Sequence, residues 1–502
     1  MKRFYRIRLP EFCILKLQEK YMKSSRHSIQ YNFIMNFILS ASSILFPLIT
    51  FPYVSRIILP AGTGKVAFAM STAAYFTMAA MLGIPTYGVR AVAQNRNDPT
   101  KLGLVLKELL CINLVMSVFA YAAFFIALVL VPQMAAEKPL MLIASASILL
   151  NVIGVTWLFQ GMEEYSYITW VSLFFKLIAV VLMVLFIHSE KDYLWYGVMT
   201  VLSSFGSGII NFIQARKYLK PARGLKMNLK IHMKPIMIFF GMTVATTVYT
   251  NLDTVMLGLM KTDFDVGIYN AAIKIKTLLV TLVTSLGTVM LPRLSEYASQ
   301  NRNEEFKALI SKALSFVLLF SIPVCVFCIF MARPMILLLS GNEYLPAVLP
   351  MIILMPTLIL IGLSNITGIQ VLVPTGREKQ VMISVIAGAV TDLLINLILI
   401  PPLGSTGAAI GTLVAETVVT LWQFWILKDL LKEIGPGIEW KCLGIMLAVS
   451  CVMSLILIQP YFQQMRPFIY LIVSGAAFFI PIGISLILSH EQILCGFLNR
   501  KG

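Results

Sequence analysis

The feature that most constrains this chain is the recurrence of long apolar segments along its whole length. An α-helix needs about 20 predominantly apolar residues to cross the hydrocarbon core of a bilayer. Fourteen segments meet this requirement, and the short stretch 334–345 before the tenth is a candidate interfacial helix. The predicted spans are 32–54, 66–88, 108–131, 139–160, 166–188, 194–214, 234–258, 267–291, 310–331, 345–369, 381–401, 405–427, 441–459 and 467–488. We therefore predict an all-α polytopic membrane protein with about 14 transmembrane helices.

The composition excludes most other classes of protein. Hydrophobic residues make up 58% of the chain and charged residues only 13%, whereas a soluble domain carries about 25% charged residues. A soluble protein this apolar cannot cover its surface with polar groups, which excludes a soluble enzyme. A transmembrane β-barrel needs alternating segments of about ten residues, and the sequence shows none. The cysteines lie mostly in apolar spans and the four histidines are scattered, so we predict no metal site and no catalytic residue.

The distribution of positive charge predicts the orientation of the chain. The sequence has 40 Lys and Arg against 23 Asp and Glu. With a cytoplasmic N-terminus, 30 of the 40 basic residues fall in segments on the cytoplasmic side and 7 in segments on the outer side. Cytoplasmic loops of membrane proteins collect Lys and Arg, so we predict that both termini are cytoplasmic. The same rule accounts for the net charge of +17, and we expect no nucleic-acid partner.

An internal repeat organises the first twelve spans. Arg90 follows Gly64 by 26 positions, Arg293 follows Gly267 by 26 positions, and each pair brackets one predicted span. Both spans are followed by the string Gln-Asn-Arg-Asn and an acidic residue. An Asn-x-x-Gly motif then recurs at 151–154 and 365–368, and the offset between the copies rises slowly from 203 to 215 residues. Such a pattern indicates duplication with small insertions.

The repeat predicts two parallel six-helix lobes. Six spans per copy is an even number, so both copies start on the same side and are related by a pseudo-two-fold axis along the membrane normal. In transporters of this design the substrate binds at the seam between the lobes while access alternates. The outer loops are short and leave no room for a catalytic domain, so we predict a transporter and not an enzyme.

The repeat also sets the predicted domain boundaries. The N-terminal arm is interpreted either as an amphipathic membrane-surface segment or as a consequence of a start site upstream of Met22. The predicted parts are a basic cytoplasmic arm (1–30), an N-lobe (31–215), a basic cytoplasmic linker (216–233), a C-lobe (234–428), two further helices (440–490) and a cytoplasmic tail (491–502).

Charged side chains inside the spans are the strongest chemical signal. Each costs about 2.5–3.5 kcal/mol at a helix centre on insertion scales, so it should face a wet cavity or a partner. The acidic candidates, which suit ion coupling, are Asp253, Asp392 and Glu416. The basic candidates for lining a substrate cavity are Lys176, Lys274 and Lys276, with Arg56, Lys65, Arg90 and Arg293 nearer the span ends. A cavity lined by cations suits an anionic substrate.

Each of these residues also has a structural interpretation. A single intramembrane Lys can snorkel or form an ion pair, Arg90 and Arg293 can anchor helix ends, and Asp253 can pair with a neighbouring base. Lys274 and Lys276 lie about 200° apart on a helix and cannot face the same way. We expect one of the two to point into the cavity. No cofactor is expected beyond H⁺ or Na⁺ coupling or the membrane potential.

Several segments together resemble the bacterial polysaccharide-biosynthesis flippases. These are the O-antigen and capsule repeat-unit transporters of the multidrug/oligosaccharidyl-lipid/polysaccharide exporter superfamily. The resemblance covers about 30–425, and its specificity comes from the order and spacing of the segments. The similar segments are 31–98, NVIGVTWLFQGMEEY (151–165), NLDTVMLG (251–258), VGIYNAAIKI (266–275), MLPRLSEYAS (290–299) and 376–418.

The resemblance implies a V-shaped pair of lobes and a specific substrate class. That class is undecaprenyl-pyrophosphate-linked oligosaccharide, moved from the inner to the outer leaflet of the cytoplasmic membrane for cell-surface polysaccharide assembly. It implies that a cationic cavity holds the pyrophosphate and sugars while the polyprenyl tail stays in lipid. Lys274 falls where a related flippase of a lipid-linked peptidoglycan precursor carries a basic residue, and spans 13–14 correspond to its two extra helices. The implied partners are membrane lipids and the polymerase and chain-length regulator of the same pathway.

The sequence leaves two alternatives to a flippase. A cation-coupled multidrug exporter of the same superfamily would favour carboxylates inside a lobe, and the first predicted lobe has none well inside its spans. A membrane-bound polymerase or glycosyltransferase would need a carboxylate cluster or a large loop outside the bilayer, and the sequence shows neither.

Overall fold

All regular structure in the described part of the chain is helical. The computed structural model describes residues 29–219, 227–435, 440–457 and 467–488; most of the predicted arm, the predicted tail and part of the linker lie outside these ranges. Within them, eleven helices are long and apolar enough to cross a membrane, or twelve if a bent helix pair counts as one span. The predicted fold class, an all-α polytopic membrane protein, is confirmed. Within the described residues, helical segments lie in each of the fourteen predicted spans, but the number of membrane crossings stays a prediction.

The predicted N-lobe is built from nine α-helices and one short 3-10 turn, and a second 3-10 turn lies at the start of the predicted linker. The start of α4 illustrates why a helix begins where it does: the Asp98 carboxylate accepts hydrogen bonds from the backbone N–H groups of Lys101 and Thr100 at 3.1 and 3.0 Å. These bonds cap the helix and lower the pKa of the Asp98 carboxyl. The elements are α2 (Ile29–Met81), α3 (Ile84–Asn95), α4 (Pro99–Leu130), α5 (Pro132–Ala136), α6 (Lys138–Gly154), α7 (Thr156–Gly161), α8 (Tyr165–Phe186), η1 (Glu190–Asp192), α9 (Tyr193–Phe205), α10 (Ser207–Ala215) and η2 (Arg216–Tyr218).

The first two predicted spans are joined inside α2 without an extended loop. The backbone of Leu59 has φ 61° and ψ 174°, which breaks the helical path, and Pro60 follows directly because a proline suits the first turn of a new helical segment. The residues between the two predicted spans therefore remain helical on both sides of a single break. Arg56 and Lys65 flank this break.

The second predicted lobe and the two helices that follow it also consist of helices joined by short turns, with one marked bend. The tenth predicted span is bent by 44° between residues 342–354 and 357–372, with Pro356 at the bend, and the stretch predicted to be interfacial forms the separate short helix α14 and part of η3. The elements are α11 (Lys230–Met260), α12 (Asp263–Ser299), α13 (Asn303–Phe330), α14 (Ala332–Leu339), η3 (Asn342–Ala347), α15 (Val348–Leu354), α16 (Thr357–Asn365), the π-helix η4 (Ile366–Leu372), α17 (Glu378–Leu403), α18 (Ser405–Ile426), α19 (Lys428–Ile434), α20 (Trp440–Leu457) and α22 (Pro467–Leu488).

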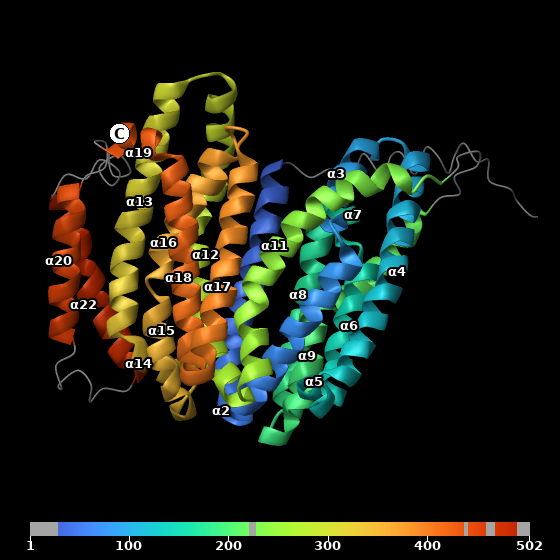
Figure 1. Ribbon diagram of the computed structural model, residues 1–502, viewed down its shortest axis with the longest axis horizontal. Helices are drawn as coiled ribbons and strands as arrows, with labels where there is room; N and C mark the ends of the chain where they lie inside the picture. The colour runs from blue at the N-terminus through green and yellow to red at the C-terminus, as the bar shows by residue number, and fades with distance from the viewer. Residues whose placement is uncertain (1–28, 220–226, 436–439, 458–466, 489–502) are drawn as a thin grey trace, which may run out of the picture.

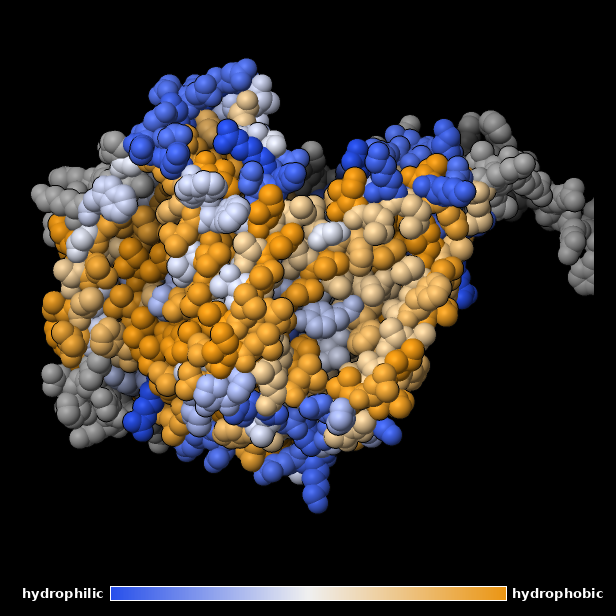
Figure 2. Space-filling model, in the orientation of Figure 1, coloured by the Kyte–Doolittle hydropathy of each residue, from blue (hydrophilic) through white to orange (hydrophobic). Residues whose placement is uncertain are grey.

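The helices run roughly parallel between two ends of the molecule. In Figure 1, α3, α7 and α19 lie at the upper end, while α5, α14 and the break in α2 lie at the lower end. Helices α3 to α10 form one side of the molecule and α12 to α22 the other, with α11 crossing between them. Figure 2 shows a broad apolar band between two more hydrophilic ends, as a surface in contact with lipid requires. The upper end corresponds to the predicted cytoplasmic side, and this orientation stays a prediction.

The two halves meet closely at the lower end, where α12 packs on α2. A Cβ at Gly64 would lie 2.8 Å from the backbone nitrogen of Gly267 and closer still to the carbonyl oxygen of Asp263. A Cβ at Gly267 would lie 2.9 Å from the Cα of Pro60 and would overlap its carbonyl oxygen. Only glycine permits this approach of two backbones. The two glycines that begin corresponding repeat segments are therefore packed against each other.

Candidate functional site

Lys176 is a buried cation held by two hydroxyl groups. It lies on α8 with 8% of its surface exposed, and its Nζ donates to Ser42 Oγ at 2.7 Å and Ser43 Oγ at 2.9 Å. Both serines in turn donate to the carbonyl oxygen of Leu39, one turn earlier in α2. These bonds orient the serine lone pairs toward the ammonium group. The partners of Lys176 are therefore neutral, and its charge is not cancelled.

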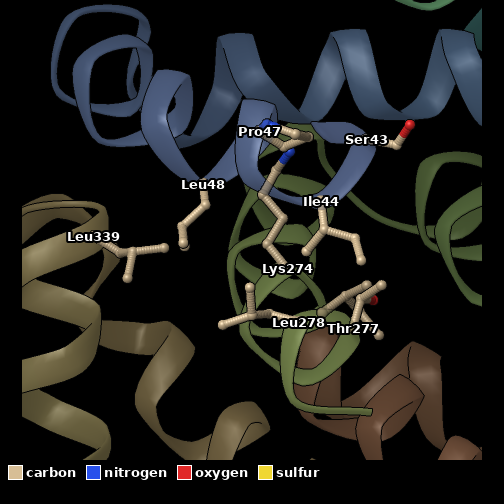
Figure 3. A pocket seen from close by; sticks show the side chains of 9 residues that line it. Ser43, Ile44, Pro47, Leu48, Lys274, Thr277, Leu278 and Leu339 are labelled. Carbon is tan, nitrogen blue, oxygen red and sulfur yellow. The ribbon is translucent and has the colours of Figure 1, made fainter. Parts of the chain in front are cut away.

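Lys274 projects from α12 toward the part of α2 that precedes the break at Leu59. Figure 3 shows its side chain reaching Pro47, with Ser43 beyond, and its Nζ lies 4.5 Å from the centroid of the Phe51 ring. One side of the lysine borders an apolar pocket of about 190 Å³, to which Ile44 and Leu339 contribute. A ring face stabilises a cation by about 0.5–2 kcal/mol, which is less than a full counter-ion provides.

Lys176 and Lys274 line one cavity of about 330 Å³. The two lysines come from different predicted lobes, and neither forms an ion pair among the described residues. The rest of the wall is rich in hydroxyl groups that can accept or donate hydrogen bonds. The hydroxyl-bearing lining residues are Ser43, Thr50, Ser172, Tyr196, Thr200, Ser203 and Ser204. We call this space the two-lysine cavity.

The acidic candidates gather in a separate cluster within the second half. Asp253 of α11 accepts hydrogen bonds from Asn396 Nδ2 at 2.6 Å and Thr412 Oγ1 at 2.7 Å. The hydroxyl of Tyr269 on α12 also donates to Asp253. Asn396 reaches Asp392 Oδ1 at 3.2 Å, so four helices contribute to one buried polar cluster.

Lys276 faces this cluster and not the two-lysine cavity. It interacts electrostatically with Asp392 and Glu416, beyond ion-pair distance. Lys274 and Lys276 thus point to opposite sides of α12, as their spacing requires. Gly411 makes room for the cluster, because a Cβ there would lie 2.9 Å from Asp392 Oδ1. The three carboxylates that the sequence offered for ion coupling are therefore brought together with one lysine.

Two of the basic candidates lie at the lower end, away from the cavity wall. Arg56 donates to the backbone carbonyls of Pro52 and Leu338 at 2.5 Å, and so ties α2 to the end of α14. Lys65 forms an ion pair with Glu137 at 2.5 Å. Both cations have protein partners and contribute to the packing of the lower end.

The remaining two basic candidates lie near the upper end. Arg90 on α3 and Arg293 on α12 are exposed. Neither lines the two-lysine cavity. Of the seven basic candidates, the structure thus brings only Lys176 and Lys274 together.

The comparison with known families agrees with this architecture. The family model described as "Polysaccharide biosynthesis protein" matches residues 29–298, which is more than half of the chain. The chain belongs to the polysaccharide biosynthesis protein family. A second family model, described as MatE, matches residues 238–398 of this family member.

Known relatives and solved structures extend the comparison. This polysaccharide biosynthesis protein is 25% identical over 410 residues to an Escherichia coli K12 protein named "Putative O-antigen transporter", a match that covers 81% of this chain and 99% of the relative. The lipid II flippase MurJ in an inward closed conformation matches with TM-score 0.60 at 17% identity, covering 90% of this chain and 100% of that one. An inward-facing multidrug resistance transporter of the MATE family matches with TM-score 0.60 at 15% identity, covering 77% and 95%. The predicted family and the prediction of a membrane transporter are confirmed.

One buried polar group in this family member was missed by sequence analysis. Glu108 of α4 is 2% exposed and accepts from the backbone N–H of Asn228 at 2.6 Å. Its other oxygen lies 2.8 Å from His232 Nε2, and His232 Nδ1 lies 2.7 Å from the hydroxyl of Tyr87. This chain of contacts fastens the start of α11 to α3 and α4. Glu108 and His232 are 124 residues apart, and no local spacing could have indicated their contact.

Proposed function

We propose that this polysaccharide biosynthesis protein flips a lipid-linked oligosaccharide with an anionic pyrophosphate head group. The substrate is an undecaprenyl-pyrophosphate-linked repeat unit, moved from the inner to the outer leaflet by alternating access for O-antigen, capsule or exopolysaccharide assembly. The membrane is the bacterial cytoplasmic membrane, with both termini cytoplasmic. The polymerase and the chain-length regulator of the same pathway receive the flipped unit.

The observation that carries this proposal is the pair of uncompensated lysines in one cavity. A charge removed from water is retained only when a partner repays part of its desolvation. Lys176 has neutral hydroxyl partners and Lys274 an aromatic face, so an anion is the missing counter-ion. A pyrophosphate offers two adjacent anionic groups, and the surrounding hydroxyls suit the first sugar.

The size of the cavity supports a binding mode in which only the head group of the substrate and the adjoining sugar lie inside it. A volume of about 330 Å³ accommodates a pyrophosphate and part of one sugar, since small-molecule pockets span about 300–1,000 Å³. The rest of the glycan would extend between the lobes. The membrane potential assists the step, because an anion leaving a negative interior gains about 2.3 kcal/mol per charge per 100 mV.

We further propose that the acidic cluster couples this movement to entry of a monovalent cation, H⁺ or Na⁺. Asp253, Asp392 and Glu416 supply three carboxylates, and among the lysines of the described residues Lys276 is the one that interacts electrostatically with Asp392 and Glu416. Such an excess of negative charge favours binding of a proton or a small cation. The cluster is separate from the two-lysine cavity, so substrate and coupling cation do not compete for one site.

A multidrug exporter is the second candidate, and the match of the MatE model to the half that holds Asp253 and Asp392 favours it. A cationic drug would need a carboxylate in the cavity between the lobes. The residues that line the two-lysine cavity include no acid. The flippase function accounts for both the lysines and the acids.

Binding of the head group tests the proposal. We expect Lys274→Met and Lys176→Met each to weaken binding of undecaprenyl pyrophosphate in nanodiscs by about tenfold or more, because a hydrogen bond to a charged group contributes about 1.5–3 kcal/mol. Lys379→Met changes an exposed lysine outside the cavity and serves as the control. Unchanged affinity in both cavity variants would refute the proposal.

A further inference from the structure

The short helix α14 of the second half ends against α2 of the first half. It lies at the lower end of the molecule (Figure 1), and the chain turns directly after it at Gly341, whose φ of 90° lies in the left-handed region that glycine favours. The carbonyl oxygens in the last turn of an α-helix have no partner within the helix. The end of α14 therefore presents hydrogen-bond acceptors to the helix that packs against it.

Two adjacent residues of α2 bind these acceptors. Arg56 Nη2 donates to the carbonyl oxygen of Leu338 at 2.5 Å and to that of Leu337 at 3.4 Å. Ser55 Oγ donates to the carbonyl oxygen of Leu339 at 3.2 Å. Three consecutive carbonyl groups at the end of α14 thus accept hydrogen bonds from the opposite half of the molecule.

The chemistry of this contact suits an interaction that forms and breaks. The C-terminal end of a helix carries partial negative charge and attracts a cation, and the planar guanidinium group of Arg56 can donate to two carbonyl groups at once. A bond from Arg56 Nη1 to the carbonyl oxygen of Pro52 orients this group within its own helix. Arg56 is exposed, so water can replace its partners when the halves separate, and the contact is reversible.

The same short helix contacts two other parts of the protein. The side chain of Leu339 borders the apolar pocket beside Lys274 (Figure 3). At the other end of α14, Met331 and Met335 pack in one apolar cluster with residues of α20 and α22. Helix α14 therefore connects the lower end of the first half both with the border of the substrate cavity and with the two helices outside the repeat.

We infer that α14 is a latch for the outer side of the transporter and that Arg56 is the residue that holds this latch closed. In the sealed conformation Arg56 and Ser55 bind the end of α14, and opening toward the outer side requires both to release it. The latch stabilises the sealed conformation of the empty protein. This inference rests on the alternating access of the proposed function, but it does not depend on which substrate is carried.

Distance measurements at both ends of the empty protein test the latch. Spin labels at Lys191 and Glu343, which line one lower-end pocket from opposite halves, report sealing of the outer side. Labels at Thr100 and Ser299, which are exposed at the upper ends of α4 and α12, report the other side. The protein would be studied in nanodiscs without substrate and with the native cysteines replaced.

We expect Arg56→Met to lower the ratio of sealed to outward-open protein by about tenfold, because it removes hydrogen bonds from a charged donor. Arg56→Lys keeps the charge but loses the forked geometry, whereas Arg56→Glu places a negative charge at the negative end of a helix. The sealed population should therefore decrease in the order Arg56, Arg56→Lys, Arg56→Met, Arg56→Glu. A general folding defect would not follow this order of charge.

Two further variants isolate the contact. Ser55→Ala removes only the bond to Leu339 and should lower the same ratio by about fivefold, as loss of a neutral hydrogen bond does. Arg333→Met is the matched control, because Arg333 is an exposed arginine in the first turn of the same helix and not at the end that Arg56 binds. This control should leave both distances unchanged.

The two label pairs distinguish a latch from a local packing contact. A latch predicts that the lower distance lengthens and the upper distance shortens in the same variants. Unchanged distances in Arg56→Met and Arg56→Glu overturn the inference, and so does a longer lower distance with no change at the upper end. Failure of the unaltered protein to bind undecaprenyl pyrophosphate would contradict the proposed substrate and would not change these distances.

Discussion

A methyl group at Gly267 should prevent the halves from sealing at the lower end. In the structure an added Cβ would lie 2.9 Å from the Cα of Pro60 and would overlap its carbonyl oxygen. These are backbone atoms, which cannot turn aside as a flexible side chain can, so α12 and α2 must move apart. Overpacking of this kind typically costs about 1–3 kcal/mol. We therefore expect Gly267→Ala to lower the ratio of sealed to open conformations by about 5- to 150-fold.

The assay is a distance measurement across the lower end. Lys191 of the first half and Glu343 of the second half line the same lower-end pocket, so spin labels at these positions report sealing. Gly267→Ala should add a population at longer distance. Gly444→Ala is the matched control, because this helical glycine has nothing within 4 Å of an added Cβ. Identical distance distributions in Gly267→Ala and Gly444→Ala would refute the reasoning.

Two further substitutions test the buried Glu108 contacts and the role of Asp253 in ion coupling. Glu108→Gln removes the charge that holds His232 and the Asn228 N–H, and should reduce the free energy of unfolding by about 1–3 kcal/mol, measured as a lower Tm in detergent; an unchanged Tm would contradict the proposed contact. Asp253→Asn should abolish the dependence of transport on an imposed H⁺ or Na⁺ gradient while the protein still folds, measured in vesicles with each gradient separately. Retention of both gradient dependences would exclude Asp253 from coupling.

Much of the fold was predictable from the sequence because lipid imposes a simple requirement. Every backbone polar group must be satisfied within the bilayer, so apolar segments of sufficient length become helices. The details that were missed are those that depend on packing. The break at Leu59 lies inside a continuous helical run, and the bend near Pro356 divides one predicted span into several helical pieces.

The candidate site was only partly predictable. The cost of burying a charge singled out Lys176, Lys274 and Asp253, since this cost depends on position along the sequence. Which of them share a cavity depends on how helices pack, and this is a long-range property. The serines at 42 and 43 are not among the residues that the sequence singles out, yet they hold the ammonium group of Lys176. Their role requires the neighbouring helix to be known.

The most direct test of the flippase account is translocation itself. Purified protein would be reconstituted into vesicles that contain an undecaprenyl-pyrophosphate-linked oligosaccharide, and an added sugar-modifying enzyme would report how much glycan reaches the opposite leaflet. The account predicts rapid translocation by the unaltered protein and none by Lys176→Met/Lys274→Met at equal incorporation. Equal rates for the two proteins would contradict a role for the two-lysine cavity in carrying the anion.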